Sequence, residues 1–218
     1  MKILDVPQSG SQAGTTSSRN RYGQYRRTRA IPVNPASAAQ VTARNRVSVN
    51  AAAWRGLTDA QRAGWEALAL LMQRSDSLGQ SYTLNGFGAY CSVNNNQLAA
   101  GNAVLSDAPA LVAPSTVESV TVTLTAASFS VAYTPTPLAA GQRVFVYASP
   151  QRSAGRSFES DYRLIHVSAA AAASPANVLA AYTARFGVPV VGNRVFLAVH
   201  VYEGGFRSGA FGVSQVVA

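Results

Sequence analysis

The chain has 218 residues and a mass of 22.8 kDa, and 48% of its residues are hydrophobic, which is enough for a buried core and excludes a wholly disordered protein. Its single cysteine excludes an intrachain disulfide framework, and no apolar run reaches the ~18–20 residues of a membrane-spanning helix. The net charge is +9, and residues 1–34 hold six basic residues against one acidic residue, so the basicity is concentrated at the start of the chain.

Residues 1–34 are rich in glycine, serine, threonine and arginine, and are predicted to form an extended basic arm or β-ribbon. Within them, residues 17–29 predict two short strands around a turn from Asn20 to Gly23, because asparagine and glycine tolerate positive φ angles. A lone hairpin with little apolar surface is marginally stable in water. We therefore expect the arm to become ordered only against a partner or a neighbouring subunit.

Residues 35–105 are predicted to form a helical section, an αα-hairpin followed by a third helix. Asn34 is expected to cap the first helix, with Pro35 at its first position, because proline lacks the amide hydrogen that would be left unpaired there. The helix is expected to run from Ala36 to about Trp54, with apolar residues at three- and four-residue spacing.

The second helix of the hairpin is marked by Thr58-Asp59-Ala60-Gln61, which has the sequence of a capping box, and is expected over about residues 59–73. Asn85 is expected to cap the third helix. Trp54 and Trp65 would then meet across the hairpin, and core packing explains them better than a ligand platform does.

Residues 106–218 are predicted to form an antiparallel β-sandwich, which makes the whole chain an α+β protein. Alternating apolar and polar residues, separated by proline and glycine, predict six strands. These are residues 117–124, 128–133, 143–148, 162–167, 194–202 and 210–217. The strand over 194–202 is apolar on both faces, which predicts a central position, and a short helix is expected within 174–186.

The sequence contains few candidate catalytic residues, and phosphate-binding, dinucleotide-binding and zinc-protease motifs do not occur in it. Glu159 and Asp161 are spaced as a carboxylate pair of the kind that cleaves glycosidic bonds. Arg156 and Arg163 lie close to them, however, and a solvated loop of mixed charge explains all four residues better.

The remaining reactive side chains are two histidines and one thiol. His166 and His200 lie within strand patterns and are expected to be structural, and Cys91 lies on a predicted helix as a small buried thiol. We therefore expect no enzymatic activity, no catalytic residue, no metal site and no cofactor.

An arginine and tyrosine cluster in the arm is the sharpest feature of the sequence. The predicted partner-binding residues are Arg19, Arg21, Tyr22, Tyr25, Arg26, Arg27 and Arg29. Arginine and tyrosine are favoured anchors at protein interfaces, and the same side chains neutralise phosphates and stack on bases. Three interpretations stay open: a contact within an assembly, a nucleic-acid contact, or a basic face in water. No helix-turn-helix, RRM or OB-fold pattern accompanies the cluster.

One resemblance begins at Pro32-Val33-Asn34-Pro35-Ala36-Ser37-Ala38-Ala39-Gln40 and continues through Arg44, Arg46, Trp54 and Leu57-Thr58-Asp59-Ala60-Gln61-Arg62-Ala63-Gly64-Trp65. This order resembles a group of uncharacterised virion proteins encoded in tailed bacteriophages and prophages, over roughly residues 10–100. The group has no known catalytic residues, so the resemblance transfers no site. In strand pattern alone, the last section resembles a fibronectin type III or immunoglobulin-like module, a common appendage of phage heads and tails.

Together these resemblances imply a non-enzymatic virion structural protein, with a capsid decoration or minor head protein favoured, anchored by its basic arm and helices. The expected partners are other virion proteins, capsid or tail subunits, in a homo-oligomeric assembly that forms in the cytoplasm of the bacterial host, without a membrane partner. The alternatives are a phage tail component, a nucleic-acid-binding protein that uses the arm, and an adhesive or carbohydrate-binding β module. The candidate platforms of that last alternative are Tyr147, Tyr162 and Tyr202.

Overall fold

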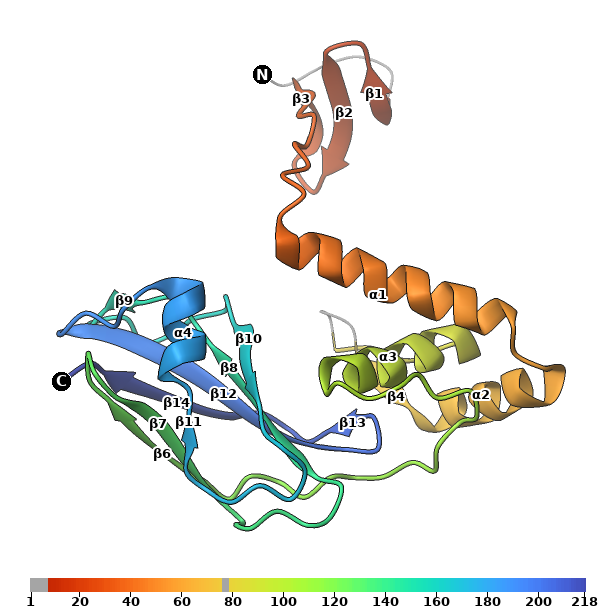
Figure 1. Cartoon of the computed structure of the whole chain (residues 1–218). Coiled ribbons are helices and arrows are strands. Elements are labelled where there is room, and N and C mark those ends of the chain that lie inside the picture. Colours follow the sequence, from red (N-terminus) through yellow and green to blue (C-terminus); the bar gives the residue numbers. More distant parts are fainter. Residues whose placement is uncertain (1–7, 76–78) are drawn as a thin grey trace. The chain divides into compact units, whose positions relative to one another are not determined.

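The computed structural model describes residues 8–75 and 79–218, as a mixed α+β chain with four helices and several antiparallel sheets (Figure 1). The α+β class predicted from the sequence is confirmed at this level. The chain divides into two compact units, Met1–Thr42 and Ala43–Ala218, and the first helix begins in one unit and ends in the other.

The first unit contains a three-stranded antiparallel sheet in the order β1-β2-β3. Its strands are β1 (Gly10–Gln12), β2 (Thr15–Asn20) and β3 (Gly23–Thr28). The turn between β2 and β3 lies where the sequence predicts it, since Asn20 pairs with Gly23, which has a φ of +115° that suits glycine. Strand β1 was not predicted, because a glycine and two polar residues carry no strand pattern.

Helix α1 (Ala38–Arg55) begins later than the sequence predicts. Ala36 has a φ of +47°, outside the helical region, so the expectation that Asn34 caps the helix and Pro35 occupies its first position is wrong. Ser37 caps the helix instead. The backbone N–H of Gln40 donates to Ser37 Oγ (3.4 Å), and the Ser37 N–H donates to Gln40 Oε1 (3.3 Å), which is a capping box.

The next two helices begin where the sequence predicts them. The Gln61 N–H donates to Thr58 Oγ1 (3.3 Å) and the Thr58 N–H donates to Gln61 Oε1 (3.0 Å), so the capping box at the start of α2 is confirmed. Asn85 caps α3 through its side chain, also as predicted. The bounds of these helices, and of the unpredicted short hairpin between them, are α2 (Asp59–Leu71), β4 (Gln73–Ser75), β5 (Ser81–Thr83) and α3 (Gly86–Ala99).

The helical section has its own apolar core, with Tyr90 at its centre. Tyr90 and Trp65 are fully buried, and their rings meet edge to face with centroids 5.0 Å apart. Trp54 also packs edge-on against Tyr90, at 5.2 Å. The predicted core packing of the two tryptophans is confirmed, because both belong to one cluster, in which each of them contacts Tyr90. The Trp65 indole N–H donates to the carbonyl of Ser106 (2.8 Å).

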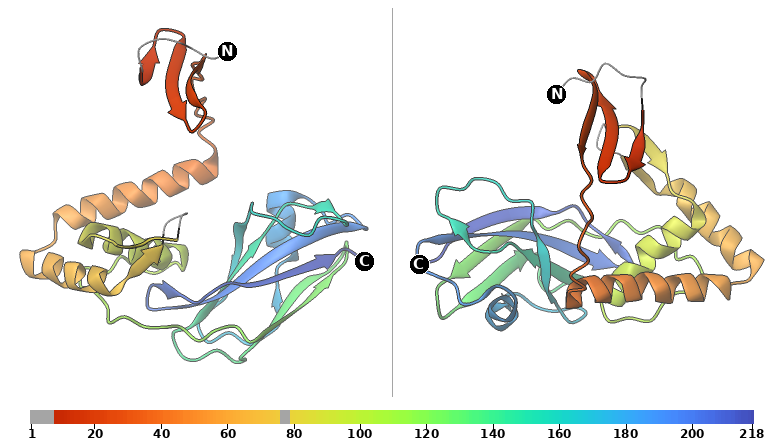
Figure 2. Two further views of the ribbon diagram at one scale, coloured as in Figure 1. Left: turned by 180° about the vertical axis from the view of Figure 1, so that it is seen from behind. Right: turned by 90° about the horizontal axis from the view of Figure 1, so that it is seen from above.

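The last part of the chain forms two antiparallel sheets, seen as facing layers in Figures 1 and 2. The larger sheet has the order β10-β8-β12-β13, with β14 and β9 also paired to β12, and the smaller has the order β11-β7-β6. The strands are β6 (Ser119–Leu124), β7 (Phe129–Thr134), β8 (Arg143–Ala148), β9 (Arg152–Ser153), β10 (Arg163–Val167), β11 (Ala176–Asn177), β12 (Asn193–Glu203), β13 (Phe206–Arg207) and β14 (Phe211–Val216). The longer strands match the predicted ones, and the two-residue strands were too short to give a pattern.

Strand β12 is central in the larger sheet, as its apolar faces predict, because β8 and β14 pair along its two edges. The alternate residues of β12 that face the core shared by both sheets are Val195, Leu197, Val199 and Val201. The predicted short helix is α4 (Leu179–Phe186). It adds the fully buried Tyr182 to this core, where the ring packs edge-on against Phe129 at 5.1 Å.

The helical section and the sheets meet where α3 packs against the end of β12 and the turn that follows it. The Tyr202 hydroxyl donates to Gln97 Oε1 (2.6 Å), and Asn96 Nδ2 donates to the carbonyl of Gly205 (2.7 Å). Phe206 of β13 belongs to the apolar core of the helical section. Residues from both parts of the second unit therefore share side-chain contacts.

Candidate partner-binding surface

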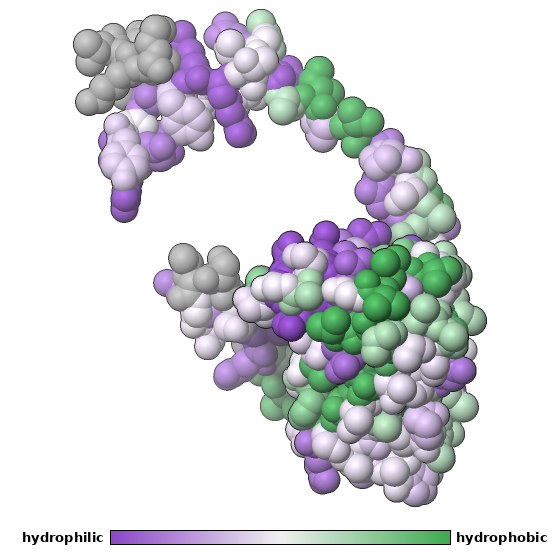
Figure 3. All heavy atoms as spheres, turned by 90° about the vertical axis from the view of Figure 1, so that its left-hand side faces the viewer, coloured by the Kyte–Doolittle hydropathy of each residue, from purple (hydrophilic) through white to green (hydrophobic). Residues whose placement is uncertain are grey.

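The seven predicted partner-binding residues lie on strands β2 and β3, in the turn between them or directly after β3. Residues 8–29 are called the basic ribbon below. No described residue of this unit, from 8 to 42, is buried, and its side chains are mostly hydrophilic in Figure 3. A sheet without a buried core gains little free energy from the removal of apolar surface from water. Its side chains remain available to a partner.

Arginine side chains project from both faces of the basic ribbon. Arg26 pairs with Ser17 across the hairpin, and Ser17 lies two residues before Arg19, so Arg19 and Arg26 share one face. Tyr25 and Arg27 alternate with them and share the other face. A partner that contacts only one face would leave about half of this charge in water.

The turn of the basic ribbon carries a cation and an aromatic ring in contact. The Arg21 guanidinium lies 4.6 Å from the centroid of the Tyr22 ring and also donates to the Tyr22 hydroxyl. Asn20 Oδ1 accepts the backbone N–H of Tyr22 (2.9 Å), which fixes the turn. Tyr22 is 72% exposed, so the turn presents an apolar surface together with a positive charge.

Part of the positive charge of the basic ribbon has no partner among the residues that the structure describes. Arg26 donates to Gln8 Oε1 (2.7 Å) within the ribbon. The side chains of Arg19, Arg27 and Arg29 form no hydrogen bond or ion pair with another described residue. These three guanidinium groups are free to bind a carboxylate or a phosphate.

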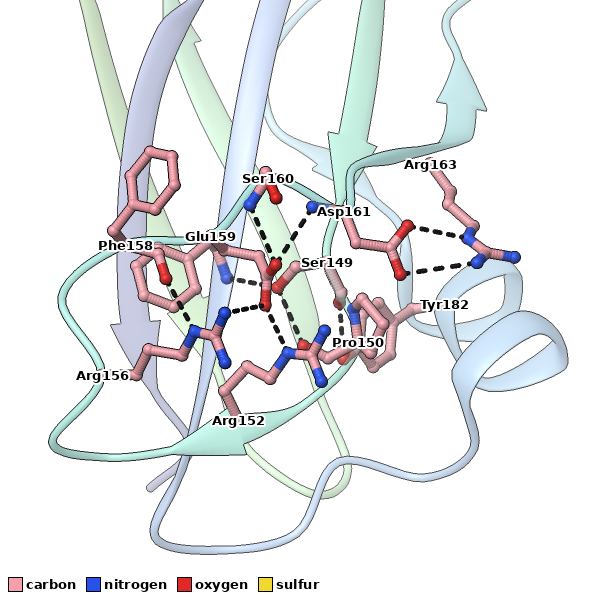
Figure 4. A network of polar contacts seen from close by, with 11 residues as sticks. Ser149, Pro150, Arg152, Arg156, Phe158, Glu159, Ser160, Asp161, Arg163 and Tyr182 are labelled. Atoms are coloured by element: carbon pink, nitrogen blue, oxygen red, sulfur yellow. Dashed lines mark hydrogen bonds and ion pairs between the residues drawn. The ribbon is translucent and has the colours of Figure 1, made fainter. Parts of the chain in front are cut away.

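The two carboxylates considered as a catalytic pair have separate structural roles (Figure 4). The Glu159 side chain is 2% exposed and accepts the backbone N–H groups of Asp161 (3.1 Å) and Ser160 (2.9 Å) and the Arg152 guanidinium. These donors, the Asp161 N–H foremost, lower the pKa of Glu159 to about 2. Asp161 pairs instead with Arg163 (3.2 Å). Because Glu159 stays ionised, it cannot serve as the proton donor that glycoside cleavage requires.

The expectation of a solvated loop is therefore wrong for Glu159, although Asp161 and Arg163 are partly exposed as expected. Arg156 also belongs to the network in Figure 4, since its guanidinium lies 3.6 Å from Glu159 and donates to the carbonyl of Phe158 (2.7 Å). The network holds the loop that follows β9.

The histidines and the thiol have the environments of structural groups. Burial lowers the pKa of both His166 and His200, so each ring is biased toward its neutral form. His200 Nδ1 lies 2.9 Å from the carbonyl oxygen of Ser208. Burial raises the pKa of the Cys91 thiol, which makes it a poorer nucleophile at neutral pH.

The three tyrosines considered as an adhesive platform do not form one surface. Tyr202 is 1% exposed and stacks on Phe145, with ring centroids 5.1 Å apart. Tyr147 and Tyr162 are half-buried, and the Tyr147 hydroxyl accepts from Arg207 (2.7 Å). Tyr202 is therefore not available to a ligand.

Within residues 8–75 and 79–218, no three side chains of histidine, cysteine, aspartate or glutamate lie close enough to hold a metal ion. The helices of this described part are each too short or too polar to cross a bilayer. Comparison of the chain with models of known protein families, with curated proteins and with solved structures finds no match. The basic ribbon is the part of the chain whose own residues point most clearly to a binding surface.

Proposed function

We propose that this protein is a non-enzymatic structural component of a bacteriophage virion, which joins the particle through its basic ribbon and the adjoining helices. The observation that carries the proposal is a sheet with arginines on both faces and no buried residue. A surface of this kind gains stability when its arginines pair with complementary charges and its tyrosines are buried against another macromolecule. Within the virion we favour the head, as a decoration or minor head protein in a homo-oligomeric array, over the tail.

The second unit supports a projecting or bridging role. Its two antiparallel sheets share one apolar core, and the strand pattern of its sequence resembles that of a fibronectin type III or immunoglobulin-like sandwich. We infer that this module extends from the particle or bridges neighbouring subunits, while the basic ribbon provides the attachment. Function does not follow from fold alone, so the attachment is the part to test.

Incorporation into particles tests the attachment. The chain is co-expressed with the proteins encoded beside it in its genome, and its copies per purified particle are counted for the wild type and for R27A/R29A. Each lost charge-assisted contact costs about 1.5–3 kcal/mol, so the variant is expected to show at least a tenfold lower occupancy at subsaturating concentration.

The matched control is R163A/R185A, which removes the same charge from two exposed arginines outside the basic ribbon and the helices next to it. Its incorporation is expected to equal that of the wild type. Equal incorporation of both double variants would refute attachment through the ribbon. Labelled copies found along the tail instead of the head would replace the head assignment with the tail alternative.

Nucleic-acid binding is the second candidate function, because the same free guanidinium groups can neutralise phosphates. If the protein has this function, the purified chain is expected to bind duplex DNA with an affinity that falls steeply between about 50 and 200 mM salt. The affinity of R27A/R29A is expected to be lower than that of the wild type. Absent or salt-insensitive binding by the purified chain would remove this candidate and leave the protein partner.

A further inference from the structure

A cavity of about 570 Å³ lies within the second unit. It is lined by residues from the end of α2, from β4, from α3, from the segment before β6, from β12, and from β13 with the residues on either side of it. This volume is within the range of about 300–1,000 Å³ that is typical of ligand-binding pockets. Arg74, His200 and Arg207 lie in its lining, and none of the described residues that line it is acidic. The cavity is therefore positively charged.

Both arginines of the cavity are held by neutral groups. Arg74 donates to Ser92 Oγ (2.9 Å), and Arg207 donates to the hydroxyl of Tyr147 (2.7 Å) and lies 5.9 Å from the centre of that ring. Neither forms an ion pair with a carboxylate of the described residues. Each guanidinium is oriented by a neutral acceptor, and no carboxylate of the described residues neutralises its charge, which is the arrangement expected of an anion-binding site.

His200 contributes a hydrogen-bonding group and no charge at neutral pH. The Ser208 carbonyl can only accept, so Nδ1 carries the hydrogen and Nε2 is left as an acceptor. Burial, and then the charge of Arg207, lower the pKa of His200. The positive charge of the cavity therefore belongs to the two arginines.

Apolar side chains also line the cavity. Leu71 and Leu111 line it and are 64% and 49% exposed, whereas Met72 and Phe206, also in the lining, are almost fully buried. A nucleic-acid backbone or a small anion would leave the two leucines in water, while an apolar side chain would cover them. The combination favours a ligand that carries both a negative charge and an apolar group.

We propose that this cavity binds an acidic, apolar peptide segment of a partner protein, with a carboxylate on the guanidinium groups of Arg74 and Arg207 and an apolar side chain on Leu71 and Leu111. The site is separate from the basic ribbon, so the inference holds whether or not the ribbon attaches the chain to a virion.

A second copy of this chain is a poorer occupant than an acidic partner. The second unit has a prominent exposed aromatic side chain, Phe158, which is 72% exposed. Its loop also carries Arg152 and Arg156, which share the single carboxylate of Glu159 and so keep a net positive charge. Two basic surfaces would repel each other, whereas an acidic segment complements the cavity.

The test uses the full chain and a pool of blocked hexapeptides built only from aspartate, glutamate, leucine and phenylalanine. Saturable binding is expected in titration calorimetry. The imidazole proton resonances of His200 are expected to shift on binding, while those of His166, on another strand, stay in place. This measurement needs no variant and so is independent of any folding defect.

Variants then assign the contacts. R74M/R207M keeps much of the apolar stem of each side chain and is expected to weaken binding at least tenfold, and L71S/L111S is expected to weaken it as well. The matched control R55M/R185M is expected to bind as the wild type does. The proposal is overturned if the wild type does not bind, if R74M/R207M binds equally well, or if asparagine and glutamine peptides, inorganic phosphate or a DNA oligonucleotide bind this site as tightly.

Discussion

At the scale of single residues, Glu159 leads to the most specific prediction, which concerns the dependence of the protein's stability on pH. Its carboxylate is almost fully buried among N–H donors, which lower its pKa from 4.5 to about 2. The unfolded chain therefore takes up this proton at a higher pH than the folded chain does. The stability that the ionised group contributes is complete above pH 4.5 and is lost as the pH falls toward about 2. We expect E159Q to lack this contribution, and hence to show a flatter dependence of unfolding free energy on pH in that window.

Urea unfolding at a series of pH values measures this dependence. D161N is the control, because its ion pair with Arg163 is about two-fifths exposed on both sides and contributes little, so the wild-type dependence is expected to persist. An E159Q profile parallel to that of the wild type would show that Glu159 is not the group responsible.

The two carboxylates of this loop could not be told apart from the sequence. Glu159 and Asp161 are both acidic, lie two residues apart and have arginines nearby. Which of them is buried depends on the pairing of β9 with the beginning of β12, a contact between distant parts of the chain. A two-residue strand is too short to have a periodicity from which such a pairing could be predicted.

At the scale of elements, the docking of α3 against the turn after β12 depends on one glycine. Gly205 has a φ of +96°, and a Cβ there would collide with the Val93 side chain on α3. G205A is therefore expected to combine backbone strain of about 1–3 kcal/mol with an overpacking cost of similar size. Chemical denaturation of the purified variant measures the sum.

The neighbouring Gly204 provides a matched control. Its φ is +57° and a Cβ there would meet nothing within 4 Å, so G204A is expected to cost only the backbone strain. G205A should thus be the less stable variant by at least about 1 kcal/mol. Equal stabilities would show that the contact with Val93 does not restrict this position.

The helices and longer strands could be predicted because their signals are local. The capping box at Thr58 and the alternation along β12 lie within the elements that they define. The sequence predicts too early a start for α1, because two residues that can cap a helix, Asn34 and Ser37, lie close together. The reciprocal bonds of Ser37 and Gln40 form, and the positive φ of Ala36 keeps Asn34 outside the helix.

At the scale of the whole molecule, the two candidate sites differ in how far the sequence reveals them. The basic ribbon is contiguous, so its arginines and tyrosines could be identified from composition and spacing alone. Arg74 and Arg207 both line the cavity, although a helix and several strands separate them in the sequence. Nothing in a linear pattern brings them together, because their proximity follows from the packing of α3 on β13.

Removal of residues 1–34 tests how the ribbon contributes to the molecule. None of the described residues 8–42 is buried, and every core side chain of the part that the structure describes belongs to the second unit. Since the ribbon adds no buried side chain to either core, its loss is expected to change the melting temperature by less than about 2 °C. Calorimetry of the shortened chain beside the full chain measures the difference. A fall of more than about 5 °C would mean that the ribbon stabilises its own chain, and the argument that its free arginines are reserved for a partner would then lose its basis.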